Sequence, residues 1–419
     1  MFLLDKKWYF IHMKTFTNQF NFRVDNQLQF INLLRKGPQS INYLAENTNI
    51  SFTAASKIVD QLVSFDILTK IATKPNEKRR GRIPNLVSIN TSVGVTCALD
   101  LSSQDLIICI NDLMGNTIVK RVISGVLFVQ EKTLNQIVKT IKEMLLEKEV
   151  DGRPLLGICI ASPGMISKNT GEIENSFRIK AAKSISLSNY FFNEFGVKVN
   201  IYNDVKISCL GEMIEGCIPK GAKNYLYVHL GNGCGTALVV DGKVYQGKNG
   251  FSGELSNIKG EININRLYGL RSICLKAEEI DSSTKYLDDN NIINVDKMID
   301  QYKQSNPVLL KAIDEIAKQN AIQLIAYNDF LDLEYIVIEG PVLLLKEKFK
   351  ESLLKYINMY DEVEFRAKII FSSLNENSSL IGTICQANNI YFLSKLEEIT
   401  NKRDPKGNYD ISEAFGDYI

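Results

Sequence analysis

Residues 225–258 read YLYVHLGNGCGTALVVDGKVYQGKNGFSGELSNI, and this stretch decides the fold class. An apolar run typical of a buried strand leads into the glycine-rich turn GNGCGTA, and a second strand follows with a hairpin at Asp241-Gly242. An earlier series starts at GVTCALDL (94–101) and continues through an amphipathic helix to the buried strand LLGICIA (155–161). Two successive series of strands and helices predict an α/β chain with two lobes that face a cleft.

The segment before these lobes predicts a separate helical module. Val24, Leu28, Ile31 and Leu34 have helical spacing, and Gly37-Pro38 ends that helix. Ser40 and Ser51 are each placed to cap a further helix. The last of these helices buries one apolar stripe and exposes small and polar residues near its N-terminus, as a recognition helix in a major groove requires. The candidates for contact with bases are Thr53, Ala54, Ser56 and Lys57.

A basic hairpin follows the predicted recognition helix. The strand-like segments ILTKIAT (67–73) and IPNLVSIN (83–90) flank KPNEKRRGR (74–82). Guanidinium groups there can enter a minor groove, and lysines can hold phosphates. The pattern predicts a winged helix-turn-helix over residues 14–92, with the alternative that the charged hairpin is only a solvated surface. The wing candidates are Lys78, Arg79, Arg80 and Arg82.

Charge and composition agree with a DNA-binding arm on a globular protein. Residues 1–90 hold 13 Lys and Arg against 6 Asp and Glu, whereas the rest of the 419 residues hold 36 against 42. Such a split favours a nucleic-acid-binding module. The eight cysteines are scattered singly inside apolar runs and predict reduced, cytoplasmic thiols. The opening residues match neither a secretory signal nor a membrane span, so we expect no membrane partner.

Several motifs in one order resemble the ROK family of bacterial repressors, open reading frames and sugar kinases. Within the family, the chain resembles the branch that contains the N-acetylglucosamine and xylose repressors, because the family's repressors carry a winged helix and its kinases lack one. It implies a two-lobed, actin-like and ribonuclease H-like sugar-kinase fold over residues 93–395, with lobes of about 93–205 and 206–395 and a tail at 396–419. The motifs are ASPGMIS (161–167), IYNDVKISCLGE (201–212), residues 229–258 and YIVIEGPV (335–342).

The first strand turn departs from the kinase pattern Asp-x-Gly-Gly-Thr-Lys. In this chain Ser102 and Ser103 replace both glycines, and Asp105 replaces the cation that would meet a polyphosphate. Added Cβ atoms and a carboxylate both oppose a phosphate there. Although GNGCGTA keeps its glycines, we expect no ATP and no other cofactor.

The resemblance places sugar-binding residues in both lobes. Asp204 falls on the position of the kinase base, but without ATP we assign it, with Asn203, to hydrogen bonds with sugar hydroxyls and predict no catalytic residue. Glu254 matches a sugar-binding residue, and Asn257 replaces a histidine that contacts sugar and ligates zinc in relatives. Because the zinc cysteine cluster is missing and only Cys274 lies in that region, we expect no metal.

The remaining ligand candidates lie in the first lobe. Gly164 belongs to the ASPGMIS motif, and the family's sugar-binding asparagine falls on Arg178, with Asn175 as a nearby substitute. An arginine in the cleft would favour a carboxylated or phosphorylated sugar, and the alternative is a surface position.

These observations favour a cytoplasmic sugar-responsive transcriptional regulator of carbohydrate genes over an enzyme. We expect double-stranded DNA and a sugar or sugar derivative as partners, in a homodimer or homotetramer. The alternatives are a ROK-type sugar kinase that phosphorylates a hexose with ATP, and a ligand-free architectural protein. The sequence leaves open the effector, the operator and whether the ligand induces or represses.

Overall fold

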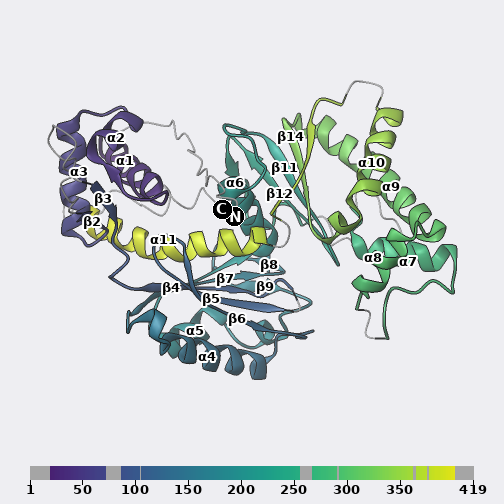
Figure 1. The fold of residues 1–419 in the computed structure, drawn as a ribbon, viewed down its shortest axis with the longest axis horizontal. Helices are drawn as coiled ribbons and strands as arrows, with labels where there is room; N and C mark the ends of the chain where they lie inside the picture. Colours follow the sequence, from purple (N-terminus) through teal and green to yellow (C-terminus); the bar gives the residue numbers. More distant parts are fainter. Residues whose placement is uncertain are drawn as a thin grey trace, which may run out of the picture. The chain divides into compact units, whose positions relative to one another are not determined.

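The structure is a computed structural model that describes residues 19–71, 86–103, 105–254, 267–289, 292–361, 365–374 and 377–401. The chain forms two compact units, each with its own hydrophobic core. Unit 1 is Met1–Glu215 with Ser379–Ile419, and unit 2 is Gly216–Ser378. Figure 1 labels their helices and strands.

Unit 1 begins with the expected winged-helix elements. Its short sheet has the order β1-β3-β2, with both strand pairs antiparallel. The sequence expectation of three helices followed by two strands is confirmed, and β1 adds a strand that the pattern does not show. The elements are α1 (Gln19–Leu34), β1 (Gln39–Ser40), α2 (Ile41–Asn47), α3 (Phe52–Ser64), β2 (Leu68–Ile71) and β3 (Leu86–Ile89).

Local side-chain chemistry sets where the second and third helices begin. Ser40 Oγ accepts a hydrogen bond from the Tyr43 amide, and Ser51 Oγ accepts one from the Ala54 amide. Each serine therefore satisfies an amide that the helix itself leaves without a partner. Both predicted N-caps are confirmed.

A mixed sheet with the order β10-β7-β4-β5-β6 forms the rest of unit 1. Strands β10, β7 and β4 run parallel, so their carboxyl ends lie at one edge. Its elements are β4 (Val95–Asp100), β5 (Leu106–Asn111), β6 (Thr117–Ile123), α4 (Glu131–Leu145), β7 (Leu155–Ser162), β8 (Met165–Ile166), β9 (Ile173–Asn175), α5 (Leu187–Phe195), β10 (Val199–Asn203) and α6 (Asp204–Glu215).

The long helix α11 (Asn377–Asn401) joins the winged helix to this sheet within unit 1 (Figure 1). Near its start Leu380 and Ile384 pack with Ala98 and Cys109 of the sheet. Farther along, Tyr391, Phe392, Leu396 and Ile399 belong to the same core cluster as the winged-helix side chains. One continuous helix thus packs against both the winged helix and the sheet of unit 1.

A buried arginine strengthens the contact between α1 and α11. Arg35 donates hydrogen bonds to Cys385 Sγ at 2.7 Å and to Asn389 Oδ1 at 2.6 Å, and its guanidinium lies 5.6 Å from the ring centroid of Phe392. Tyr391 adds a hydrogen bond from its hydroxyl to the Asp66 carbonyl. These contacts join residues more than 300 positions apart in the chain.

Helix α11 corrects two of the expected boundaries. The second lobe does not extend to residue 395, because the chain returns to unit 1 at Ser379. The tail does not begin at residue 396, because Leu396 and Ile399 are buried against the winged helix. The apolar spacing of α11 is dispersed around its surface, so the sequence did not show which units it contacts. The rest of the expected tail, 402–419, lies outside the described residues.

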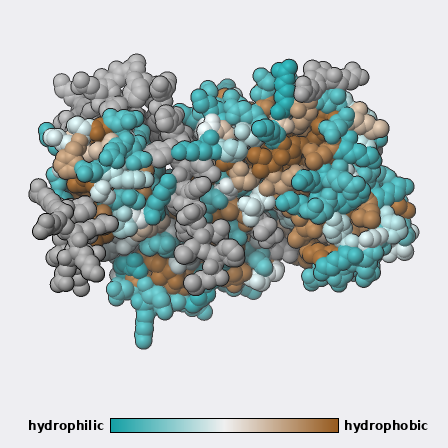
Figure 2. Space-filling model, turned by 45° about the horizontal axis from the view of Figure 1, so that its top comes forward, coloured by the Kyte–Doolittle hydropathy of each residue, from teal (hydrophilic) through white to brown (hydrophobic). Residues whose placement is uncertain are grey.

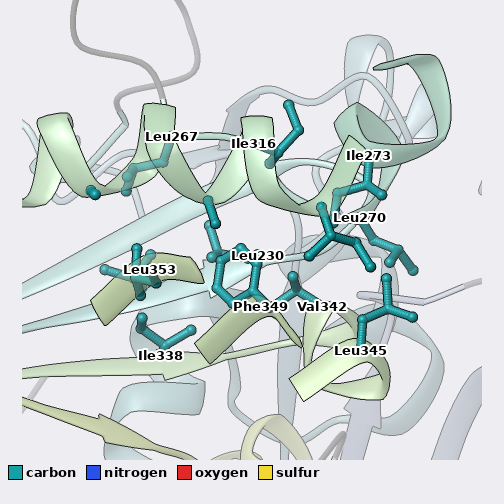
Figure 3. Packing of buried hydrophobic residues seen from close by; sticks show 14 of the residues in the cluster. Leu230, Leu267, Leu270, Ile273, Ile316, Ile338, Val342, Leu345, Phe349 and Leu353 are labelled. Atoms are coloured by element: carbon teal, nitrogen blue, oxygen red, sulfur yellow. The ribbon is translucent and has the colours of Figure 1, made fainter. Parts of the chain in front are cut away.

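Unit 2 contains a sheet with the order β13-β12-β11-β14-β15, in which β11, β14 and β15 are parallel. Side chains from this sheet and its helices form the core that Figure 3 shows from close by, including Leu230, Ile316, Ile338 and Phe349. The elements are β11 (Tyr225–Leu230), β12 (Cys234–Val240), β13 (Lys243–Val244), α7 (Leu270–Ile280), α8 (Val295–Lys303), α9 (Pro307–Leu331), β14 (Tyr335–Glu339), α10 (Lys346–Tyr360) and β15 (Lys368–Phe371).

The surface and the cysteines fit the sequence expectations of a globular protein. Hydrophilic side chains predominate on the face in Figure 2, where hydrophobic ones gather in separate patches. No disulfide joins any of the eight cysteines, which all lie in the described part of the chain, and six of them are buried. Burial raises the pKa of the Cys109 thiol to about 11, so it stays protonated near neutral pH. Among the described residues, every helix is too short or too polar to cross a bilayer.

Candidate functional site

The candidate site residues of unit 1 lie at the carboxyl edge of its parallel strands. Asp100 ends β4, Ser162 ends β7, and Asn203 ends β10 directly before α6. The strand register pairs Asp100 with Ala161 and Asn203 with Ser162, so these chain ends are neighbours. Ligands in α/β folds bind at such edges, where loops and helix starts expose polar groups.

Asn203 fixes the geometry of this edge. Its side chain is 8% exposed. The amide Nδ2 donates to the Gly164 carbonyl at 3.0 Å, and Oδ1 accepts from the Lys206 amide at 3.0 Å. The second bond caps the start of α6, so Asn203 connects that helix to the loop after β7.

Gly164 has no room for a side chain. Its φ of +122° favours glycine, and an added Cβ would lie 2.4 Å from the Asn175 carbonyl oxygen. This close approach holds the short β8–β9 hairpin against the edge. The structure therefore brings Gly164, Asn175 and Asn203 together, as expected for residues of one site.

Asp204 is the first residue of α6 and is half-buried. Its Oδ1 accepts a hydrogen bond from the Val205 amide at 3.0 Å. A carboxylate at a helix N-terminus is stabilised by the helix dipole. A half-buried carboxylate in this place can accept hydrogen bonds from hydroxyl groups of a ligand.

The structure gives Arg178 three backbone partners. Its Nε donates to the Leu101 carbonyl at 2.9 Å and its Nη1 to the Leu127 carbonyl at 3.3 Å, while Nη2 bonds the Ser103 carbonyl. Burial lowers the pKa of Arg178, and nearby Asp100 and Asp204 oppose that effect. The ligand-binding role of Arg178 stays a prediction, but its donors face the first strand turn.

That turn does not fit a nucleotide. The Asp100 carboxylate accepts a hydrogen bond from the Ser102 amide at 2.8 Å, and Ser103 Oγ donates to the Asp105 carbonyl at 2.8 Å. The amide that a phosphate would need is therefore satisfied inside the turn. The residues present do not suit ATP here.

In unit 2 the loop GKNGFSGE is fixed to strand β12. Gly253 has a φ of +88°, and an added Cβ would lie 2.1 Å from the Thr236 carbonyl oxygen. Thr236 Oγ1 in turn donates to the Gly253 carbonyl at 2.9 Å. This contact positions Glu254 next in the chain. Asn257 lies outside the described residues, so its ligand role and the zinc expectation stay predictions.

A paired histidine and glutamate lie beside the glycine turn of unit 2. His229 Nδ1 is 2.5 Å from Glu339 Oε2, and the two residues pair across β11 and β14. An added Cβ at Gly231 would lie 2.6 Å from His229 Nε2, so the imidazole lies against the turn. Sequence reasoning missed this pair because its members are 110 residues apart.

The candidate DNA interface is the exposed face of α3. Thr53 and Lys57 are exposed, and Ala54 and Ser56 are partly exposed. Phe52, which the sequence reasoning omitted, is 55% exposed at the first position of the helix. The sequence did hold a signal for Phe52, because this residue directly follows the Ser51 cap and so begins the predicted recognition helix. Lys78, Arg79, Arg80 and Arg82 lie outside the described residues.

Comparison with known proteins identifies the family of the lobes. The ROK family model matches residues 96–389. The chain belongs to the ROK family. The xylose repressor of Caldicellulosiruptor bescii is 24% identical over 81% of this chain and 92% of its own length.

Solved ROK structures share the fold described above. A ROK family transcriptional regulator, described as a homolog of the E. coli MLC protein, superposes with a TM-score of 0.71 and 18% identity, covering 91% of this chain and all of its own. The ROK family glucokinase of Streptomyces griseus, in complex with glucose and AMPPNP, superposes with a TM-score of 0.57 and 16% identity. The superposition covers 71% of this chain and all of the glucokinase chain. The fold is therefore the mixed α/β, sugar-kinase-like fold of ROK proteins.

Proposed function

We propose that this ROK protein is a sugar-responsive transcriptional repressor that binds duplex DNA and does not phosphorylate its sugar. The observation that carries the proposal is the combination, in one unit, of a winged helix and a sugar-kinase edge whose phosphate turn is closed on itself. The similarity over 81% of this chain to a protein named xylose repressor supports it and makes a pentose the first effector to test.

A screen of ligands and DNA tests this function. The full chain is mixed with pentoses, hexoses, amino sugars, sugar acids and sugar phosphates, and its melting temperature is measured. A ligand of the native state raises that temperature by mass action. The same ligand is expected to change the affinity for a duplex enriched by in vitro selection. DNA binding that no small molecule alters would instead support an architectural protein.

Helix α11 supplies a path by which a bound sugar can act on the winged helix. Asp204 begins α6, and the Ile207 carbonyl of that helix directly meets Gly382 of α11. Farther along α11, Cys385 and Asn389 accept hydrogen bonds from Arg35, the residue directly after α1. A ligand that shifts α6 therefore changes the support of the winged helix, and in a dimer it changes the spacing of the two recognition helices.

Asp204→Asn is expected to remove the sugar response and to leave DNA binding without sugar unchanged. The amide keeps the shape of the carboxylate but is a poorer acceptor for sugar hydroxyls, so we expect about 10- to 100-fold weaker sugar binding. The measurement is the sugar-dependent shift in melting temperature together with DNA affinity. Glu131→Gln, in the first turn of α4, controls for the loss of a helix-dipole interaction.

The same variant tests the kinase alternative, which the position of Asp204 and the similarity to a ROK glucokinase keep open. Each sugar is incubated with ATP and magnesium, and ADP is measured. Turnover by the natural chain that disappears in Asp204→Asn would contradict a regulator without enzyme activity.

Phe52→Ala is expected to weaken specific DNA binding about 5- to 100-fold, because a phenylalanine at the start of a recognition helix can contact a thymine methyl group. The measurement replaces each thymine of a selected half-site with uracil. One such replacement should weaken binding by the natural chain and leave Phe52→Ala unaffected. Phe330→Ala, a change at an 86% exposed phenylalanine of unit 2, is the control. Equal losses for both proteins at every thymine would exclude Phe52 from base contact.

A further inference from the structure

Arg178 binds three backbone carbonyls from two separate segments of unit 1. Leu101 and Ser103 belong to the turn after β4, and Leu127 precedes α4. The arginine's own segment is joined to the α4 side by the bridge between Val129 and Ile179. A planar guanidinium can bind several acceptors at once, which a lysine ammonium does less rigidly. Arg178 is therefore placed to hold this turn in one conformation.

Carboxylates at the turn also engage nearby backbone amides in hydrogen bonds. Asp100 accepts from the Ser102 amide, and Asp105 accepts from the Gly125 amide at 3.3 Å. An incoming phosphate would find these donors already engaged. It would also meet the carboxylates of Asp100 and Asp105, which repel a negative charge.

Arg178 also lies within the electrostatic reach of Asp100, which ends β4, and of Asp204, which begins α6. With three of its donor groups on carbonyls, the guanidinium serves these internal partners more than an external anion.

We propose that Arg178 is a positioning residue that holds the turn after β4 closed at the carboxyl edge of the parallel strands, so that the unit 1 edge accepts an uncharged sugar and excludes phosphorylated ligands. This inference rests on the proposed function for the identity of the ligand. An arginine in the cleft would favour an anionic sugar as ligand. This inference instead predicts a neutral polyhydroxyl compound.

Arg153 provides a matched control within the same unit. It donates to the carbonyls of Val150, Thr91 and Glu149 at distances of 2.9, 3.3 and 3.0 Å. It precedes β7 and so lies at the opposite end of the parallel strands from Asp204. Arg153→Ala therefore removes an equal set of carbonyl bonds without touching the turn.

The first experiment measures amide hydrogen exchange over residues 101–110 in the full chain without ligand. Arg178→Ala and Arg178→Lys are both expected to speed exchange there by about tenfold or more, since neither side chain can reproduce the three bonds. Arg153→Ala should leave exchange in this segment unchanged. Unchanged exchange in Arg178→Ala would overturn the proposed positioning role.

The second experiment measures melting temperature with pyrophosphate, magnesium-AMPPNP, neutral sugars and the matching sugar phosphates. The natural chain is expected to respond to a neutral sugar and to none of the phosphorylated compounds, and Arg178→Ala should bind that sugar about tenfold more weakly. A response to pyrophosphate or a sugar phosphate that Arg178→Ala loses would overturn the inference, because Arg178 would then be an anion receptor. Unchanged sugar affinity in Arg178→Ala would also contradict it.

The two experiments separate this inference from the proposed function. If no sugar and no DNA bind, the proposed function fails, while the exchange data and the pyrophosphate result still decide the role of Arg178. If sugar and DNA both bind but exchange at the turn is unchanged, only the inference about Arg178 fails.

Discussion

Replacing Arg79, Arg80 and Arg82 together with alanine is expected to lower the affinity for duplex DNA about 100-fold near physiological salt. Each cation that neutralises a phosphate releases counterions and adds roughly −0.9 to the slope of log K against log salt. If Lys57 and the wing cations neutralise about five phosphates, the natural protomer should give a slope of roughly −4 to −5. Losing three cations should therefore reduce the slope by about 3.

A charge-matched variant separates the wing from a general loss of positive charge. Lys285, Lys303 and Lys355 are exposed lysines of unit 2, and their joint replacement with alanine changes net charge by the same amount. We expect that control to leave the slope of log K nearly unchanged, because phosphate contacts and not net charge set the slope. A triple wing variant with an unchanged slope would remove the wing from the interface.

Gly382→Ala is expected to destabilise unit 1 and to abolish DNA binding, although alanine normally favours a helix. In a helix interior the change from glycine to alanine stabilises by about 1 kcal/mol. At Gly382, however, an added Cβ would lie 2.0 Å from the Ile207 carbonyl oxygen. The added Cβ is bonded directly to the backbone of α11, and the Ile207 carbonyl belongs to the backbone of α6. Neither can rotate away, so α11 has to move away from α6.

The cost of that displacement decides the sign of the effect. Overpacking a core costs about 1–3 kcal/mol, and α11 also supplies Tyr391, Phe392 and Leu396 to the winged-helix core. We expect the melting temperature to fall by roughly 3–10 °C and specific DNA binding to be lost in the same variant. Gly233→Ala, whose added Cβ would meet nothing within 4 Å, is the control for stability. A stabilised Gly382→Ala protein would contradict the close contact between α6 and α11.

Local sequence was sufficient for the elements and for part of the site. Ser40 and Ser51 start their helices because a cap requires only a hydroxyl and an amide three residues away. Asn203 and Asp204 could be assigned to one site because they are adjacent in the motif IYNDVKISCLGE, which carries the family resemblance. The closed phosphate turn was also readable, since Ser102, Ser103 and Asp105 are consecutive or nearly so.

The partners of the longest side chains required the tertiary structure. Arg178 bonds residues about 50 to 77 positions away, Arg35 bonds α11, and His229 pairs with Glu339. Each pairing depends on the order of the strands in a sheet or on where α11 packs on unit 1. A local sequence pattern specifies neither of these. This is why the sequence suggested an anion for Arg178, whereas the structure provides three carbonyl oxygens.

The sequence by itself therefore determined the modules of this protein: a basic winged helix, a two-unit α/β fold and a degenerate phosphate turn. Periodicity, caps and turn residues act over a few positions, so they can be read along the chain. Only the tertiary structure decided that α11 belongs to both the winged helix and the sugar-kinase sheet of unit 1. That choice depends on burial of side chains against segments hundreds of residues away, which only the folded chain brings together.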